Sequence, residues 1–320
     1  MGQYIIRRLL LFVPTLILVS LIVFFVMRIV PGDPALIILS GTTGDGEFTP
    51  EQLEAKRVDL GTNRHIMVQY WQWASGILTG DLGDSYWHQG ITANAEIKRT
   101  FPVTLQLAFM AIVMSFVLAI PIGVMGAVAI DSPIDYAGKV FTITGVALPT
   151  FWIAILMIYA LARFFDWLPP LFYANLWDEP WTNMKQMFFP AFALCLQNCA
   201  FQARVTRSAM LEVLQEDYIR TARAKGLSER IVLFRHALKS AFLPVITVSG
   251  WQFSRLLGGA ILVEIIFVIP GIGDLMVESV QLRDYNIIQA LVMLAAVVVL
   301  AINLVVDLFY GWLNPRVRYS

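Results

Sequence analysis

The chain has 320 residues, of which 58% are hydrophobic and 14% are charged, and its formal net charge is zero. Soluble domains carry about 25% charged residues, so a chain this apolar is expected to be a polytopic membrane protein. A zero net charge gives no overall positive field, which excludes nucleic-acid binding through a generally basic surface.

The first apolar run covers residues 9–30 and follows Arg7 and Arg8. A secretory signal has an apolar core of about 7–15 residues and a small-residue cleavage site. This run is longer and has no clear cleavage site, and about 20 residues are enough to cross a bilayer. It is therefore predicted to be a retained transmembrane helix, with Arg28 near its far end reaching the interface.

Residues 31–100 form a polar segment, with nine acids against five bases, that is predicted to be an extracytoplasmic insertion. Residues 49–52 (TPEQ) have the pattern of a helix N-terminus, for a short helix that ends at Gly61. A second helix is expected from Val68 to Gly80. The insertion is either a cap packed on its own apolar side chains or a platform for a binding protein. A membrane-surface belt is expected from its aromatic residues Tyr70, Trp71, Trp73, Tyr86 and Trp87.

Five further apolar runs are predicted to be transmembrane helices, because every backbone polar group in hydrocarbon needs a partner within its own segment. They cover residues 102–130, 140–165 (interrupted by Pro149), 188–203, 241–263 and 287–310. The predicted fold is an all-α polytopic membrane protein of six transmembrane helices. It has an extracytoplasmic insertion between helices 1 and 2 and a five-helix core at residues 101–320.

The distribution of charge indicates the orientation in the membrane. If both termini are inside, the cytoplasmic segments carry thirteen Lys and Arg, against three in the two short external loops. Cytoplasmic loops have an excess of Lys and Arg. Both termini and the loop at residues 204–240 are therefore predicted to be cytoplasmic.

The loop at residues 204–240 is the only long basic segment, with eight Lys and Arg. Ala222 and Ala224 precede Gly226, which can take a positive φ at a helix end. A second short helix is expected at residues 228–240. Two short helices joined by small residues would form a knob that fits a groove on a cytoplasmic partner. Ordinary positive-inside anchoring is the alternative.

Polar residues on one face of the fifth predicted span indicate a transport route. A charge at the bilayer centre costs about 2.5–3.5 kcal/mol on insertion scales, so such a residue should face protein or water. Ser249, Gln252 and Arg255 are predicted to line a polar translocation path, and structural bonding between spans is the alternative. The same two roles are open for the polar residues of the fourth span, Gln197, Asn198 and Gln202.

The sequence carries no catalytic signature. Its three histidines lie far apart, and it has no P-loop motif for ATP, so the chain is expected not to be an enzyme and to hold no cofactor or metal. Cys195 and Cys199 lie four residues apart in an apolar run, where helix geometry disfavours a disulfide. They are predicted to be two buried thiols.

Motifs along nearly the whole chain resemble those of one family, the dipeptide/oligopeptide branch of ABC-transporter inner-membrane permeases. In the commonest form of these permeases the knob opens with Glu-Ala-Ala, and a Leu-Pro pair lies closer to the glycine than it does here. This chain differs on both points, and the dipeptide/oligopeptide branch shares both differences. The motifs are Thr221-Ala222-Arg223-Ala224 with Gly226, Leu243-Pro244, VQYWQW, GDLGDSY, Glu264 before Phe267-Val268-Ile269-Pro270-Gly271-Ile272-Gly273, Arg283-Asp284-Tyr285, Asp307 and Asn314-Pro315-Arg316.

The resemblance implies roles for particular residues. The residues that dock onto an ATPase subunit would be Asp217, Thr221, Ala222, Arg223, Ala224, Lys225, Gly226 and Leu227. A re-entrant or gate element on the outer side, with a plain surface turn as the alternative, would contain Glu264, Pro270, Gly271, Gly273, Arg283 and Asp284.

The resemblance also implies a function and partners. The chain would be the permease subunit of an ATP-driven importer of di- or oligopeptides in a bacterial or archaeal inner membrane, working by alternating access. Its partners would be a second related permease, two ABC ATPases that bind ATP and Mg, and an extracytoplasmic binding protein. Nickel chelates, glutathione or oligosaccharides are alternative substrates. A channel or secondary transporter is the alternative class, although the sequence lacks the internal repeats and mid-membrane acids typical of such carriers.

Overall fold

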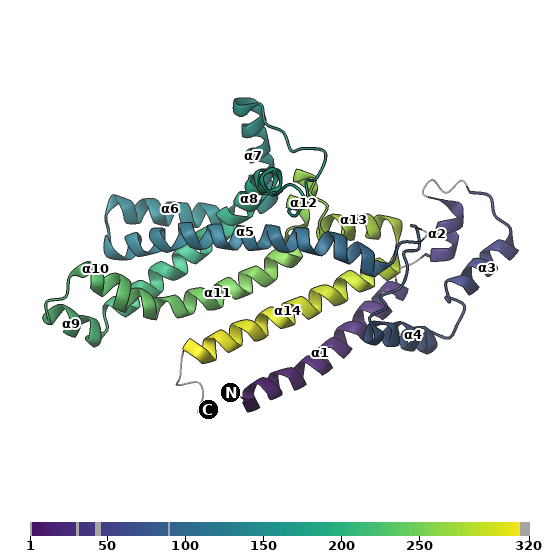
Figure 1. Ribbon diagram of the computed structural model, residues 1–320, viewed down its shortest axis with the longest axis horizontal. Helices are drawn as coiled ribbons and strands as arrows, with labels where there is room; N and C mark the ends of the chain where they lie inside the picture. Colours follow the sequence, from purple (N-terminus) through teal and green to yellow (C-terminus); the bar gives the residue numbers. More distant parts are fainter. Residues whose placement is uncertain (1, 30–31, 42–45, 89, 314–320) are drawn as a thin grey trace. The chain divides into compact units, whose positions relative to one another are not determined.

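The computed structural model describes residues 2–29, 32–41, 46–88 and 90–313. In these ranges the chain forms helices and no β-strand, apart from one isolated bridge between Asp84 and Thr92 (Figure 1). The predicted all-α class is therefore confirmed. The helices are α1 (Gly2–Ile29), α2 (Pro34–Ser40), α3 (Pro50–Asp59), α4 (Ile66–Thr79), α5 (Ala93–Val128), α6 (Pro133–Ala147), α7 (Thr150–Phe165), α8 (Pro180–Leu214), α9 (Asp217–Ala224), α10 (Glu229–Ile231), the π-helix η1 (Val232–Ala237), α11 (Leu238–Gly259), α12 (Ile261–Phe267), α13 (Ile272–Leu282) and α14 (Tyr285–Leu313).

The chain forms two compact units. Of the described residues, the first contains 104–270 and 301–313, so helices α6 to α12 all belong to it. The second contains residues 2–103 and 271–300, which brings α1 and the insertion together with α13 and the start of α14. The basic loop and the polar residues of the fifth span therefore lie in one unit, and most of the predicted gate segment lies in the other.

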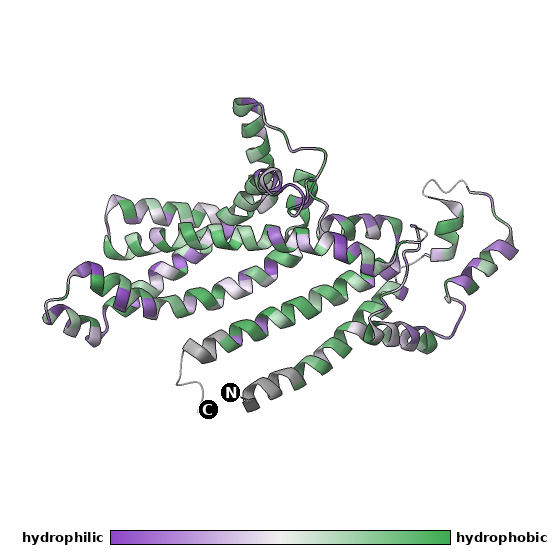
Figure 2. Cartoon of the chain, viewed as in Figure 1, coloured by the Kyte–Doolittle hydropathy of each residue, from purple (hydrophilic) through white to green (hydrophobic). Residues whose placement is uncertain are grey.

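Four helices of the described chain are long and apolar enough to cross a membrane. They contain residues 10–29, 93–128, 229–258 and 285–308, and Figure 2 shows the hydrophobic colour along most of α5 and α14. The bent pair α6 and α7 brings the number to five if it forms one span. The predicted span at residues 188–203 lies inside the long helix α8, which is not in this group, so the count of six spans stays a prediction.

The third predicted span is not one straight helix. Helices α6 and α7 are bent by 105° at a break where Leu148 has extended dihedral angles, φ −80° and ψ 129°. Pro149 explains the break, because its ring disfavours the helical conformation of the preceding residue and it has no N–H to donate. The sequence showed the interruption but not the size of the bend.

Two predicted helix boundaries in the insertion are confirmed. Thr49 Oγ1 accepts from the Gln52 N–H at 3.2 Å, and the Gln52 side chain accepts from the Thr49 N–H at 2.9 Å, which completes a capping box at the start of α3. Helix α3 ends just before Gly61. Helix α4 ends at Gly80, which has a left-handed φ of 82°.

The second unit has an apolar core in which α1 packs against α4. The Phe24 ring contacts those of Tyr70 and Trp73 with centroids 5.3 and 5.6 Å apart, and the Tyr70 hydroxyl lies 3.0 Å from Ser20 Oγ. Tyr70 and Trp73 therefore anchor the insertion to the first span, whereas Trp71 of the same helix is exposed. Only part of the predicted aromatic belt is free to contact a membrane surface.

Helix α8 packs against α6 and α11 in the first unit. Cys195 and Cys199 are free and buried in an apolar cluster with Ala119 and Ala203, as predicted. Gly123 permits the close approach of α5 to α8, because a Cβ there would lie 2.7 Å from the Ala203 carbonyl oxygen. These small residues allow α8, from which the basic loop begins, to lie close to α5.

Candidate functional site

Residues 216–237, here called the basic knob, begin with α9 and turn at Gly226. Gly226 has a φ of 78°, and the N–H groups of Gly226 and Leu227 donate to the carbonyls of Arg223 and Ala222 at 2.9 and 3.4 Å. This is a Schellman motif, which satisfies the last carbonyls of a helix and places a left-handed residue after it. The left-handed backbone conformation accounts for the glycine at position 226, as predicted. An added Cβ would meet no atom of the described chain within 4 Å.

An ion pair closes this turn. Arg223 Nε lies 2.7 Å from Glu229 Oε1, which links the end of α9 to the start of α10, and Arg223 Nη2 donates to Glu229 Oε2 at 3.3 Å. Both side chains are partly exposed, so the pair positions the turn more than it stabilises the fold. The Tyr218 hydroxyl donates to Ser240 Oγ at 2.9 Å, which joins α9 to α11 by a second contact.

One face of the knob is buried in the first unit. Ile219 and Ala222 pack in a cluster with Val124 of α5, Met210 of α8 and Val232 of η1. Of the eight predicted docking residues, Ala222 is therefore turned inward and anchors α9. The other seven are exposed: Asp217, Thr221, Arg223, Ala224, Lys225, Gly226 and Leu227.

The outer face of the knob combines basic and apolar side chains. Tyr218, Leu227, Ile231 and Phe234 are exposed large apolar residues, and Phe234 is 59% exposed. Apolar residues surrounded by charges are typical of protein-interaction surfaces. Tyr218, Ile231 and Phe234 were not among the docking residues predicted from the sequence. The available signal was the spacing of apolar residues at positions 227, 231 and 234 in an otherwise polar segment.

The second helix of the knob is continuous with the following span. Helix α10, η1 and α11 follow one another without a break, and residues 229–258 form one helix that is apolar enough to cross a membrane. The expected end of a short helix at residue 240 is therefore wrong. Pro244 lies inside α11, where a proline is tolerated because neighbouring groups compensate for the missing N–H bond. The knob and this span therefore share one continuous helical segment.

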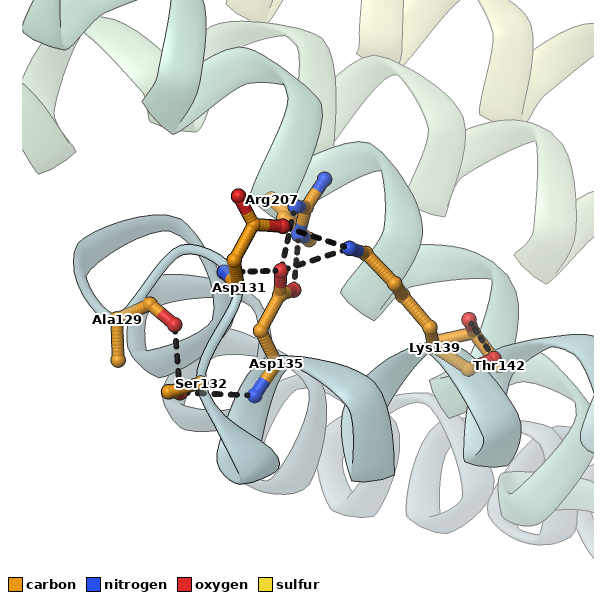
Figure 3. A network of polar contacts seen from close by, with 7 residues as sticks. All are labelled: Ala129, Asp131, Ser132, Asp135, Lys139, Thr142 and Arg207. Carbon is orange, nitrogen blue, oxygen red and sulfur yellow. Dashed lines mark hydrogen bonds and ion pairs between the residues drawn. The ribbon is translucent and has the colours of Figure 1, made fainter.

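A buried carboxylate joins α6 to α8 in the same unit, as Figure 3 shows. Asp135 Oδ1 accepts from Arg207 Nε at 2.7 Å, and its Oδ2 accepts from Arg207 Nη2 at 3.0 Å and lies 2.8 Å from Lys139 Nζ. The carboxylate has no exposed surface. The N–H of Asp131 also donates to it, at 3.2 Å. This network was not predicted from the sequence, although Ser132 and Asp135 have the spacing of a helix N-cap and its third residue.

Four of the predicted path residues line one cavity in the first unit. Gln197 and Asn198 of α8 and Gln252 and Arg255 of α11 border a space of about 400 Å³, which also has Trp251 in its lining. The Arg255 guanidinium lies 4.9 Å from the Trp251 ring centroid. No Asp or Glu of the described residues lines the cavity. The path-lining role expected for Gln252 and Arg255, and left open for Gln197 and Asn198, stays a prediction, to which this common cavity gives a place.

The amides of this cavity are only partly satisfied. Gln252 Nε2 donates to the Asn198 carbonyl at 3.2 Å, but its buried Oε1 accepts no hydrogen bond from any described residue. Gln197 Oε1 accepts from Thr150 Oγ1 at 2.5 Å. A buried polar atom without a partner is costly, so Gln252 Oε1 is suited to a water or a ligand N–H.

Ser249 has a different environment. It is buried outside the cavity lining, accepts from Gln202 Nε2 at 2.9 Å and donates to the Val245 carbonyl at 2.6 Å. The bond to Gln202 links α11 to α8. For Ser249 and Gln202 the geometry therefore favours the alternative role, bonding between helices.

The predicted gate residues divide between the two units. Glu264 and Pro270 belong to the first, where Glu264 is fully buried and accepts from Thr104 Oγ1 at 2.6 Å. Between them Val268 has a left-handed φ of 56°. For a residue other than glycine this conformation costs about 1–2 kcal/mol, so the turn after α12 stores backbone strain.

The other gate residues surround the ends of α13 in the second unit. Gly271 caps its start, and Gly273 is buried in its first turn. Arg283 follows its end with a left-handed φ of 53°. The Arg283 guanidinium lies against Gly32, where any side chain would collide with it.

Asp284 ties this segment to the insertion within the second unit. Its Oδ2 accepts from Ser85 Oγ at 2.5 Å and from the Tyr86 N–H at 3.0 Å, and the Trp87 indole N–H donates to the Leu282 carbonyl. Burial raises the pKa of Asp284, although the hydrogen bonds that its carboxylate accepts from Ser85 and from the Tyr86 N–H oppose the shift. The GDLGDSY and Arg-Asp-Tyr motifs, about 200 residues apart, thus contact each other.

Comparison with known proteins shows similarity over almost the entire chain. Residues 119–319 match the model described as "binding-protein-dependent transport system inner membrane component", and residues 1–108 match that of its N-terminal part. A putative peptide transport system permease of Brucella abortus (strain 2308) is 38% identical over 320 residues, with full coverage of both chains. A dipeptide transport system permease of Alkalihalophilus pseudofirmus is 35% identical, and an oligopeptide transport system permease of Bacillus subtilis is 36% identical, again with full coverage.

Solved structures have the same fold at lower identity. A methionine ABC transporter in an inward-facing conformation aligns with a TM-score of 0.55 and 17% identity, covering 68% of this chain and 96% of that chain. An amino acid ABC transporter aligns with a TM-score of 0.54 and 16% identity, covering 67% and 92%. At this identity the likeness supports the fold alone.

Proposed function

The chain belongs to the family of inner-membrane components of binding-protein-dependent transport systems, and we propose that it is the translocation subunit of an ATP-driven importer of di- or oligopeptides. Membership of the family makes it a permease component of an ABC importer. The energy source, the mechanism, the orientation and the substrate belong to the proposal.

The observation that carries this proposal is the construction of the basic knob. Its inner face is packed against α5 and α8, its outer face presents basic and apolar side chains, and its second helix continues into a membrane span. A surface of this kind suits the groove of a cytoplasmic ATPase subunit. Closure of that subunit on ATP would move the knob as a rigid body, and α11 with it.

The proposed assembly contains two ATPase subunits, a second related permease and an extracytoplasmic binding protein. ATP and Mg would be bound by the ATPase subunits. Both termini and the knob would be cytoplasmic, in agreement with the Lys and Arg distribution. The insertion, fixed to α1 through Phe24, Tyr70 and Trp73, would receive the binding protein.

The proposed translocation path includes the cavity between α8 and α11. Peptides have a charged carboxylate and many amide groups, and the cavity offers the cation of Arg255 together with the amides of Gln197, Asn198 and Gln252. Alternating access would open this space to one side of the membrane and then to the other as α11 moves. Peptide substrates are favoured by the names of three relatives, which are peptide, dipeptide and oligopeptide permeases. A glutathione transport system permease of Salmonella choleraesuis, 37% identical, supports that tripeptide as the second candidate.

The path is tested by Arg255→Ala in proteoliposomes that contain the whole complex and the binding protein. The wild type is expected to take up a labelled dipeptide only with ATP. The variant should lose about tenfold in uptake, the loss expected when a hydrogen bond to a charged group is removed. Arg163→Ala is the matched control, because Arg163 also lies beside an aromatic ring but outside the cavity. Wild-type uptake and ATPase rates in Arg255→Ala would make Arg255 structural.

A further inference from the structure

A second cavity, of about 200 Å³, lies within the second unit. It is bordered by side chains from α1, α4, the following loop and the start of α14, and most of them are polar. None of the residues discussed for docking or translocation lines it. Its lining residues that matter here are Arg28, Gln69, Asp81, Tyr86 and Gln289.

Two buried donors in this lining have no acceptor among the residues that the structure describes. Gln289 is 1% exposed, and its Nε2 makes no hydrogen bond within that part of the chain. Arg28 Nη1 is also buried and unpartnered, although Nη2 of the same guanidinium donates to Gln69 Oε1 at 3.3 Å. The guanidinium lies over the Phe24 ring, 4.1 Å from its centroid, so its position is fixed. Buried polar groups are normally paired, so two orphaned donors bordering one space indicate an absent acceptor.

The charges around the cavity define that acceptor. Arg28 supplies a positive charge. Burial raises the pKa of Tyr86 to about 12, so its hydroxyl stays neutral. Asp81 is the single acid among the described residues of the lining; it is exposed, and its Oδ1 accepts from the Gly83 N–H at 2.9 Å. A second carboxylate, that of Asp284, accepts from the Tyr86 N–H behind the lining. One cation with these acids nearby favours a ligand with a single negative charge over a doubly charged phosphate, because like charges repel. The volume is several times that of one water molecule, which occupies about 30 Å³.

We propose that this cavity binds a carboxylate, with one oxygen held by Arg28 Nη1 and the other by Gln289 Nε2. The ligand would be a small free carboxylate or the carboxyl end of a short peptide. Both sources present the same two oxygens to the same two donors. The site is separate from the cavity between α8 and α11, so it does not depend on the proposed translocation path.

The test uses the full-length protein with its co-purifying subunits in nanodiscs, and the probe is ¹³C-labelled acetate observed by saturation-transfer NMR. The wild type should show saturable binding. Gln289→Leu, which removes an unpaired donor and preserves apolar packing, and Arg28→Gln should each weaken binding about tenfold, as for one hydrogen bond to a charged group. Arg64→Gln is the matched control, because Arg64 is an exposed arginine of the same unit outside the lining. Thermal midpoints of the variants equal to that of the wild type would exclude misfolding as the cause of weaker binding.

Competition distinguishes the two sources. Displacement of acetate by dialanine but not by dialanine amide would assign the site to the carboxyl end of a peptide. Displacement by neither would assign it to small free carboxylates. Absence of saturable acetate binding, wild-type affinity in Gln289→Leu and Arg28→Gln, or tighter binding of inorganic phosphate than of acetate would overturn the proposal.

Discussion

Replacing Gly226 with phenylalanine is expected to abolish ATP-coupled uptake while the chain remains inserted in the membrane. Gly226 is exposed and no atom of the described residues lies within 4 Å of an added Cβ, so this part of the chain has space for the new ring. The collision would occur only with a docked partner. The left-handed φ of 78° adds a backbone cost of about 1–2 kcal/mol for any residue with a side chain. Retention of ATPase subunits on the purified complex and peptide uptake are the measurements.

Gly80→Phe is the matched control for the backbone cost. Gly80 also ends a helix with a left-handed φ of 82° and has free space around its Cα, but it lies in the insertion. It should retain the ATPase subunits fully. Phe234→Glu provides a second test without a left-handed backbone, because Phe234 lies within the π-helix η1, has no positive φ and is 59% exposed. Normal ATPase retention in both Gly226→Phe and Phe234→Glu would contradict docking at the knob.

Arg207→Ala is expected to give the largest loss of stability. It removes the bidentate partner of the fully buried Asp135 carboxylate and leaves Lys139 as the only cation beside it. Breaking a buried ion pair from one side is strongly destabilising, so the thermal midpoint in detergent should fall by roughly 10 °C. Uptake should fall too, because the pair joins α6 to α8 next to the knob.

Two comparisons identify the cause of that loss. Arg220→Ala removes the exposed partner of Asp217, 3.5 Å away, and should leave the midpoint almost unchanged. Asp135→Asn combined with Arg207→Gln removes both charges and should recover much of the stability. A midpoint of Arg207→Ala equal to that of Arg220→Ala would show that the buried pair contributes little.

Features set by neighbouring residues could be predicted from the sequence. The capping box at Thr49, the helix end at Gly80 and the left-handed Gly226 depend on the backbone needs of a few adjacent positions. The polar face of α11 followed from helical spacing alone. The inward position of Ala222 and the outward position of Phe234 could not be predicted from helical spacing. The neighbours that cover one face of the knob come from α5 and α8.

Features set by distant pairs could not be predicted. Asp135 and Arg207 are 72 residues apart, and Gln202 and Ser249 are 47 apart. Nothing local reveals which of several polar residues will meet. Spacing placed Ser249, Gln252 and Arg255 on one side of α11, but the rotation of that helix against α8 put Ser249 in an interhelical bond and the other two in the cavity. The 105° bend at Pro149 likewise depends on packing beyond the proline itself.

The central claim is that this permease moves solute only when its knob is driven by a nucleotide-hydrolysing partner. The most direct measurement compares uptake of a labelled dipeptide by proteoliposomes that contain the chain with its permease partner alone and by vesicles that contain the full complex with binding protein and ATP. We expect uptake only in the second case, and none when the ATP is replaced by a non-hydrolysable analogue. Equal uptake without ATPase subunits or nucleotide would contradict the claim.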